Sequence, residues 1–263
     1  MKIAIIGCGV MGSAFARFWA QKHEVYLCGR DPAKLQDLSS EIKAPILSSE
    51  EAAQKADVIL LSFKPKDLKA AAKSLSPYLA GKIVISILSG ADTKVLESSF
   101  PKTHIVRTMP NLALTSGEGI IGVADSLDPP LKAKISDLFS GMGLVYFLPE
   151  SKMEGFTALC GSSPAFIYVM LEAMMEGGVA LGFSFDDAKE LVIKAFEGAI
   201  ALLKDSGKHP AELKMQISSP GGTTIAGLNE MEKQGVRSGL IKTLFACYHR
   251  ASEMAEQHKK TSL

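Results

Sequence analysis

The amino-acid sequence predicts an α/β protein in which a doubly wound sheet is followed by an all-helical domain. Three observations carry this prediction. Short apolar strands alternate with helical segments up to about residue 150, a glycine-rich loop directly follows the first strand, and only helical patterns remain after it. Strands that alternate with helices are typical of a largely parallel sheet with helices on both faces.

The N-terminal half contains seven strand-like segments. They cover residues 2–6, 24–28, 57–62, 82–87, 104–108, 119–124 and 144–147. Segments with helical spacing or helix-start signals lie between them, at 13–21, from 31, and at 66–78, 93–98 and 131–139. The segment at 57–62 is almost entirely apolar, which is typical of a strand buried on both faces. We therefore expect right-handed crossover connections within one sheet.

The C-terminal part shows helical patterns only. They cover residues 153–159, 164–181, 186–204, 210–215, 223–233 and 236–259. We place the domain boundary so that residues 1–155 form the nucleotide-binding domain and residues 156–263 the helical domain. The long helices are apolar enough to bury the helices of a second chain, and the sequence does not separate that arrangement from a monomer core.

Composition and charge exclude several classes of protein. The chain has 263 residues, a net charge of +1 and no basic block, so neither nucleic acid nor an anionic membrane is an expected partner. No signal peptide is recognised, and no stretch is expected to approach the roughly 18 apolar residues of a membrane span. The four cysteines are scattered, which favours a reducing cytoplasm. The histidines show no metal-ligand spacing, so we expect no metal site.

A dinucleotide-binding motif opens the chain. Residues 7–12 have the pattern Gly-x-Gly-x-x-Gly between a strand and a helix. Gly7 permits the tight turn, Gly9 lets the backbone approach a pyrophosphate, and Gly12 lets the helix pack close to the sheet. We interpret Cys8, inside this loop, as a small packing side chain. The sequence therefore predicts a Rossmann-type nucleotide site.

The end of the second strand indicates which nucleotide binds. An NAD site usually places Asp or Glu there to hold the ribose hydroxyls. This strand ends in Gly29, Arg30 and Asp31, and the Arg30 guanidinium has the fork geometry that suits a 2′-phosphate. We therefore predict that NADPH is preferred over NADH. The alternative is that Arg30 is a solvated loop charge and Asp31 only caps the next helix.

Further polar turns follow other strands at the same predicted edge of the sheet, at 62–65, 86–90 and 109–111. Each is also compatible with ordinary turn chemistry. The residues that we assign to the cofactor are Ile6, Gly7, Cys8, Gly9, Val10, Met11, Gly12, Arg30, Ser62, Phe63, Lys64, Pro65, Met109, Pro110 and Asn111.

A second motif lies at 218–224, with the sequence Ser-Ser-Pro-Gly-Gly-Thr-Thr, directly before a predicted helix. The unpaired N–H groups of a helix start, with hydroxyl groups beside them, suit a carboxylate or phosphate. The alternative is an ordinary turn between two helices, with a threonine as N-cap.

Together these motifs resemble the pyrroline-5-carboxylate reductase family along essentially the whole chain. The resemblance rests on Gly7-x-Gly9-x-x-Gly12, Lys64-Pro65, residues 107–111 and 161–166, and above all residues 218–228. Arg237-Ser238 and Glu253 also fit. The chain departs from the family at Leu112-Ala113, Ser163 and Lys66, which concerns cofactor affinity and nicotinamide pose more than reaction class.

The resemblance implies an NADPH-dependent reduction of 1-pyrroline-5-carboxylate to L-proline, without a metal. It also implies a helical dimerisation domain, an active site at the dimer interface, and in many cases a ring of dimers. By resemblance Ser219, Gly222, Thr223 and Thr224 contact the substrate, with Gly221 contributing backbone at the same helix start. Thr224 is the catalytic candidate, because its hydroxyl suits the ring nitrogen. Gln216 is a weaker candidate contact, and an exposed helix-end residue is its alternative.

Two other functions are considered. A β-hydroxyacid-dehydrogenase-like reductase begins with a similar glycine motif but uses a catalytic lysine after the domain junction, and here no lysine follows residue 152 until Lys189. A non-catalytic NADP-binding sensor or dimerisation module would not need the complete turn at 218–224. A comparison of turnover with pyrroline-5-carboxylate and turnover with 3-hydroxyacids distinguishes the three functions.

Overall fold

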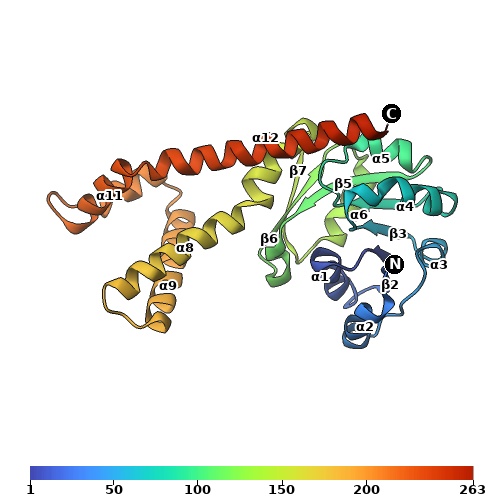
Figure 1. Cartoon of the computed structure of the whole chain (residues 1–263), viewed down its shortest axis with the longest axis horizontal. Helices are drawn as coiled ribbons and strands as arrows, with labels where there is room; N and C mark the ends of the chain where they lie inside the picture. The colour runs from blue at the N-terminus through green and yellow to red at the C-terminus, as the bar shows by residue number, and fades with distance from the viewer. Residues whose placement is uncertain (263) are drawn as a thin grey trace. The chain divides into compact units, whose positions relative to one another are not determined.

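The computed structural model describes residues 1–262 and divides the chain into two compact units (Figure 1). The first unit comprises residues 1–162 together with the C-terminal helix from residue 247 on, and the second comprises residues 163–246. The final helix thus belongs to both units. This structural division does not test the sequence-based assignment of residues 1–155 to nucleotide binding and of residues 156–263 to the helical domain, which remains a proposal.

The first unit contains one sheet of seven strands in the order β2-β1-β3-β4-β5-β6-β7. The strands are β1 Lys2–Ile6, β2 Glu24–Cys28, β3 Val58–Leu61, β4 Ile83–Ser86, β5 His104–Pro110, β6 Gly119–Ala124 and β7 Gly143–Leu148. Strands β1 to β5 are parallel, as predicted. β6 runs antiparallel to β5, and β7 is parallel to β6.

The reversal at β6 follows from the length of its connection. Only residues 111–118 join β5 to β6, and they hold the short 3₁₀ helix η4, Leu112–Ser116. A parallel pairing needs a crossover of a dozen or more residues, usually a helix, so this connection returns the chain in the opposite direction. The sequence analysis placed no helix between these two strands, but it expected right-handed crossovers within one sheet and did not foresee this reversal.

Helices cover both faces of the sheet. They are α1 Val10–Trp19, α2 Gln36–Ile42, α3 Ser49–Lys55, α4 Leu68–Leu75, α5 Thr93–Ser99, α6 Pro129–Leu138 and α7 Met153–Phe156, with 3₁₀ turns η1 Pro32–Leu35, η2 Pro65–Asp67, η3 Ser76–Tyr78 and η5 Glu150–Lys152. The sequence analysis missed α3. Its signal is a capping box, in which Ser48 and Glu51 satisfy each other's backbone N–H groups.

Two hydrophobic clusters lie on opposite faces of the sheet, because alternate strand residues point to opposite sides. Ile3 and Ile5 of β1 join the cluster with α1, α2 and α6, whereas Ala4 and Ile6 join the cluster with α3, α4 and α5. The first unit is therefore a three-layer structure with a core on each side of the sheet, and the edge strand β7 leaves Leu144 and Tyr146 exposed.

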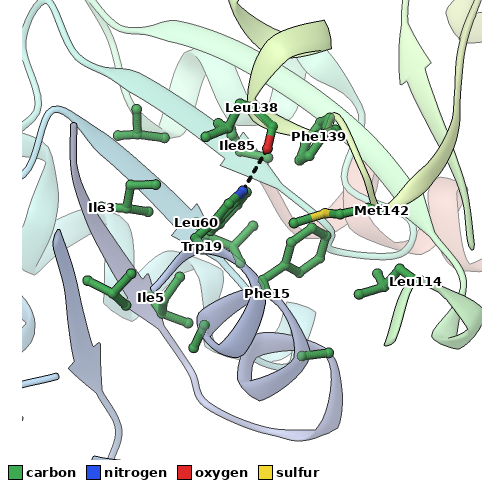
Figure 2. Packing of buried hydrophobic residues seen from close by; sticks show 14 of the residues in the cluster. Ile3, Ile5, Phe15, Trp19, Leu60, Ile85, Leu114, Leu138, Phe139 and Met142 are labelled. Atoms are coloured by element: carbon green, nitrogen blue, oxygen red, sulfur yellow. Dashed lines mark hydrogen bonds between the residues drawn. The ribbon is translucent and has the colours of Figure 1, made fainter. Parts of the chain in front are cut away.

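The single tryptophan links α1 to α6 inside the first of these clusters (Figure 2). Trp19 is buried, and its indole nitrogen donates to the backbone oxygen of Leu138, at 2.9 Å, at the end of α6. Phe15 and Phe139 pack around the indole with ring centroids 4.9 and 6.1 Å away. This packing fixes α1, the helix that the Gly-rich loop opens.

The second unit is helical, as predicted. Its helices are α8 Ser163–Ala180, α9 Phe185–Ser206, α10 Pro210–Gln216, α11 Thr223–Lys233 and the first part of α12 Val236–Ser262. Helices α8 and α9 pack on each other. Among residues 163–246 only Ala188 and Val192 are buried, so this unit has almost no core of its own.

One helical stretch, Glu150–Ala180, has the length and hydropathy of a membrane span. The sequence-based expectation that no stretch approaches such a span was wrong in this respect. Length and composition are weak support for membrane insertion, because an apolar helix that packs against protein has the same composition.

Candidate active site

The Gly-rich loop is held against the neighbouring strand by backbone packing. Gly7 has φ +104°, and a Cβ there would come within 2.9 Å of the backbone of Ser62 and Phe63, after β3. The Gly7 N–H donates to the oxygen of Cys28, at the end of β2, at 2.9 Å. A Cβ at Gly12 would overlap the Gly7 oxygen. Both glycines are therefore explained by the fold of the loop itself.

Gly9 is different, because the protein fills no space beside it. No atom lies within 4 Å of the position that its Cβ would take, and its φ of −75° does not require glycine. Gly9 is the N-cap of α1, and within the described chain no side chain caps this helix and no acidic residue stands in its first turn. Exposed N–H groups, the helix dipole and open space together suit a pyrophosphate.

Cys8 lies between these glycines as a neutral thiol. Its sulfur is 3.7 Å from the Cys28 backbone oxygen, and burial raises the pKa of the thiol to about 11. A thiol with this pKa is almost fully protonated at neutral pH and is a poor nucleophile. The structure therefore agrees with the interpretation of Cys8 as a packing side chain.

Two of the predicted cofactor residues use their side chains within the protein. The Ser62 hydroxyl donates to the Gly7 oxygen at 2.7 Å. The buried Asn111 amide donates to the Cys160 oxygen at 3.2 Å, and its oxygen accepts from the Ile120 N–H at 3.1 Å. Both side chains thus shape the edge of the sheet, and any direct contact with the cofactor would be additional to these bonds.

The other predicted cofactor residues lie near the same strand ends. Phe63 packs partly against the second core cluster, Met109 packs against Leu148, Met153 and Phe156, and Lys64 is exposed before η2. Arg30 is also exposed, and its guanidinium lies 3.7 Å from the carboxylate of Asp67. The sequence analysis did not foresee this ion pair.

The sequence analysis did not predict the buried charge cluster around Arg107. Arg107 of β5 is only 4% exposed and makes ion pairs of 3.0 Å with Glu150 and with Glu154. Glu150 also accepts from the backbone N–H and the hydroxyl of Thr93, at the start of α5. A buried arginine requires such partners. The cluster ties the segment around α7 to the sheet, close to the Asn111–Cys160 bond.

The turn at 218–224 lies in the second unit and forms an uncapped helix start. Gly221 has φ +69°, and Gly222 is the N-cap of α11. Among the described residues no side chain caps this helix, and its first turn contains no acid. The N-cap is glycine, so the alternative of a threonine cap was wrong. Thr223 is exposed and Thr224 half-buried in the first turn, so their hydroxyls and the helix N–H groups lie together.

The remaining candidates of this region differ in their surroundings. Gln216 is exposed as the last residue of α10, and Ser219 is exposed, with its backbone oxygen accepting from the Gly222 N–H at 3.1 Å. The Gly-rich loop lies in the first unit and this turn in the second. In residues 1–262, no group of three or more His, Cys, Asp or Glu side chains is arranged to hold a metal ion.

A doubly wound sheet with a nucleotide-type loop, combined with an anion-type helix start, defines a dinucleotide-dependent oxidoreductase. Family models agree with both halves. Residues 2–90 match the family described as NADP oxidoreductase, coenzyme F420-dependent, and residues 150–254 match pyrroline-5-carboxylate reductase dimerisation.

Relatives of known name cover nearly the whole chain. Pyrroline-5-carboxylate reductase of Synechocystis is 35% identical, with 98% of this chain and 99% of the relative covered, and that of Aquifex aeolicus is 32% identical, with 98% and 97% covered. The crystal structure of pyrroline carboxylate reductase of Plasmodium falciparum with NADP bound has a TM-score of 0.89 and 28% identity, over 97% of this chain and 98% of that one. The chain belongs to the pyrroline-5-carboxylate reductase family.

The first prediction compares Gly9 with Gly12. Gly9→Ala should leave stability unchanged or raise it by up to about 1 kcal/mol, because the backbone angles suit alanine and space is open. It should weaken NADPH binding at least about tenfold, because the methyl group occupies the approach to the pyrophosphate. Gly12→Ala should instead destabilise the protein by about 1–3 kcal/mol. Urea unfolding and calorimetric titration measure both effects. Unaltered NADPH affinity in Gly9→Ala would contradict this assignment of the open space.

Proposed function

We propose that this chain reduces 1-pyrroline-5-carboxylate to L-proline with NADPH, the last step of proline biosynthesis. The observation that carries the proposal is the pairing of an open nucleotide loop at Gly9 with an uncapped, neutral helix start at Gly222. Relatives named for this activity are 30–35% identical to the chain over most of its length. The relative from Plasmodium falciparum was solved with NADP bound.

The chain fits NADPH at the end of the sheet. Residues 6–12 offer backbone N–H groups and open space to the pyrophosphate, and Arg30 offers its exposed guanidinium to the 2′-phosphate. The turns at 62–65 and 109–111 line the same edge of the sheet. When bound, NADPH supplies the hydride that the imine carbon receives.

The substrate is a cyclic imine with a carboxylate, and the turn at 218–224 suits its anionic end. The N–H groups at the start of α11 and the hydroxyls of Ser219, Thr223 and Thr224 can bind the carboxylate. Gly221 and Gly222 leave backbone accessible there, and Gln216 is a further polar group nearby in sequence. These contacts hold the ring in place, so they act through orientation and electrostatics.

Thr224 is the residue to which we assign the ring nitrogen, directly or through water. An unperturbed threonine hydroxyl is a poor acid, so its role is to hold and orient the nitrogen. Substrate that arrives as the iminium needs no proton from the enzyme.

The chain works as a homo-oligomer whose dimer forms through the helical unit. The second unit exposes many large apolar side chains. They include Ile167, Tyr168, Val169, Met174, Val179, Leu181, Phe183, Phe185, Ile200, Leu202, Ile241 and Phe245. A unit with two buried residues cannot hold its helices in water alone. In the dimer, these faces cover each other and bring the turn at 218–224 to a nucleotide site, and dimers can assemble further into a ring.

We assign the protein to the cytoplasm. All four cysteines are free thiols, which suits a reducing compartment. The apolar stretch Glu150–Ala180 overlaps the matched dimerisation model, so a second chain, and no membrane, is its partner in this proposal. Nucleic acid is not a partner either, because the net charge is +1.

The second prediction tests the reaction and Thr224 together. The wild-type protein should oxidise NADPH with pyrroline-5-carboxylate, and it should not reduce NADP⁺ with 3-hydroxyacids. Thr224→Ala should lower kcat/KM roughly 10–1000-fold, the range for loss of one positioned donor. Thr224→Ser, which keeps the hydroxyl, should retain most of the activity, and NADPH affinity should be the same in all three. If Thr224→Ala has wild-type kcat/KM, Thr224 has no part in the mechanism.

The third prediction concerns the 2′-phosphate. Arg30→Ala should weaken NADPH binding about 10–100-fold through loss of charge-assisted hydrogen bonds, while NADH binding changes little. Arg17→Ala, which removes another exposed arginine of the same domain, is the matched control. Titration calorimetry with both nucleotides measures the ratio, and equal weakening of NADPH and NADH would contradict the role of Arg30.

The fourth prediction concerns assembly. Light scattering should give a mass of at least twice the chain's 28.0 kDa. Val169→Glu should disrupt the assembly, because a charge would be buried between apolar helices. Tyr78→Glu, at a less exposed site of the first unit, is the control and should not change the mass. A wild-type monomer at micromolar concentration would overturn the proposed dimer.

A further inference from the structure

Arg30 and Asp67 join the two strands that flank β1. In the sheet order β2-β1-β3, Arg30 follows β2 by two residues, and Asp67 ends η2, which follows β3. The Arg30 Nη1 and the Asp67 Oδ2 lie 3.7 Å apart. The pair therefore spans the end of β1, from which the Gly-rich loop emerges. This is the corner where the adenosine ribose of a Rossmann-bound dinucleotide lies.

Asp67 brings a carboxylate to a corner where β2 itself supplies none. Asp31, the nearest acid in sequence, already caps η1 by accepting from the Ala33 N–H at 3.2 Å, and it pairs with Lys34 at 3.6 Å. Asp67 in contrast makes no side-chain bond that caps α4, within the part of the chain that the structure describes. The carboxylate instead forms an ion pair with Arg30, so its position is not explained by helix capping.

The pair is weak enough to be displaced. The Arg30 side chain is 84% exposed and the atoms are 3.7 Å apart, and exposed pairs of this kind are populated only a few times more than their separated state. A 2′-phosphate carries more charge than a carboxylate and matches the guanidinium fork better. A carboxylate that stays beside a bound phosphate would repel it, so the two anions exclude each other at Arg30.

We propose that Asp67 tunes the choice between NADPH and NADH by competing with the 2′-phosphate for Arg30. This inference rests on the proposed use of NADPH. Asp67 holds Arg30 when no 2′-phosphate is present, and NADPH must displace it. The carboxylate therefore lowers the affinity for NADPH and leaves that for NADH, which does not need Arg30, almost unaffected.

The test is direct titration of NADP⁺, NAD⁺ and adenosine 2′,5′-bisphosphate into the full-length protein. Asp67→Asn should bind NADP⁺ and the bisphosphate about two- to sixfold more tightly, because Arg30 no longer has to be released. NAD⁺ should change by less than about twofold. Asp125→Asn is the matched control for the change in net charge, because Asp125 follows β6, which runs in the opposite direction, and has its own partner Lys132.

Combining Asp67→Asn with Arg30→Ala separates competition from repulsion. If Asp67 acts through Arg30, the tighter binding disappears in the Arg30→Ala background. Equal tightening in both backgrounds, no tightening at all, or the same tightening in Asp125→Asn would each overturn the inference. A wild-type protein that binds no NADP⁺ would instead overturn the proposed function, so the two failures are distinguishable.

Discussion

The packing around the carbonyl oxygen of Gly7 is the interaction on which the fold of the Gly-rich loop and the neighbouring strand ends depends. The Ser62 hydroxyl donates to it at 2.7 Å, and the absence of a side chain at Gly12 lets α1 begin directly against it. Because Gly7 also donates to Cys28, one residue connects β1 to β2 and β3. The same contacts fix the ends of β2 and β3 beside the end of β1. The loops that follow β2 and β3 therefore place Arg30 and Asp67 on either side of the Gly-rich loop. The residues proposed for nucleotide binding and for nucleotide choice thus share one packing constraint.

The two units differ in how much of their apolar surface is buried. In the first unit helices pack on both faces of the sheet, and alternate residues of β1 contribute to separate clusters. In the second unit the helices show their apolar side chains to the outside. The Arg107 cluster lies at the end of the first unit and anchors Glu150 and Glu154 with buried charges. These ion pairs hold the segment around α7 against the sheet within the first unit.

The parts of the fold that local patterns determine could be predicted from the sequence. The strands, most helices and the Gly-rich loop follow from apolar runs, helical spacing and three glycines. The reversal at β6 depends on a connection too short for a crossover, and α3 on the capping box of Ser48 and Glu51, which a search for apolar periodicity overlooks. The ion pairs of Arg107 and the Arg30–Asp67 pair join residues 37 to 47 positions apart, so these partners can be identified only once the sheet order is known. The roles of Gly9 and Thr224 remain predictions.

The composition of the turn at 218–224 has a consequence for the proposed chemistry. Residues 218–226 contain no charged side chain, so the substrate carboxylate would be held by N–H groups, hydroxyls and the helix dipole alone. An arginine or lysine at this place would bind the carboxylate more strongly, but its positive charge would stand close to the C=N bond. A nearby positive charge disfavours the protonated imine, and the protonated imine is the better hydride acceptor. In the proposed reaction, donors without a full positive charge would bind the anionic end of the substrate and would oppose the charge at its nitrogen less than an arginine or lysine would.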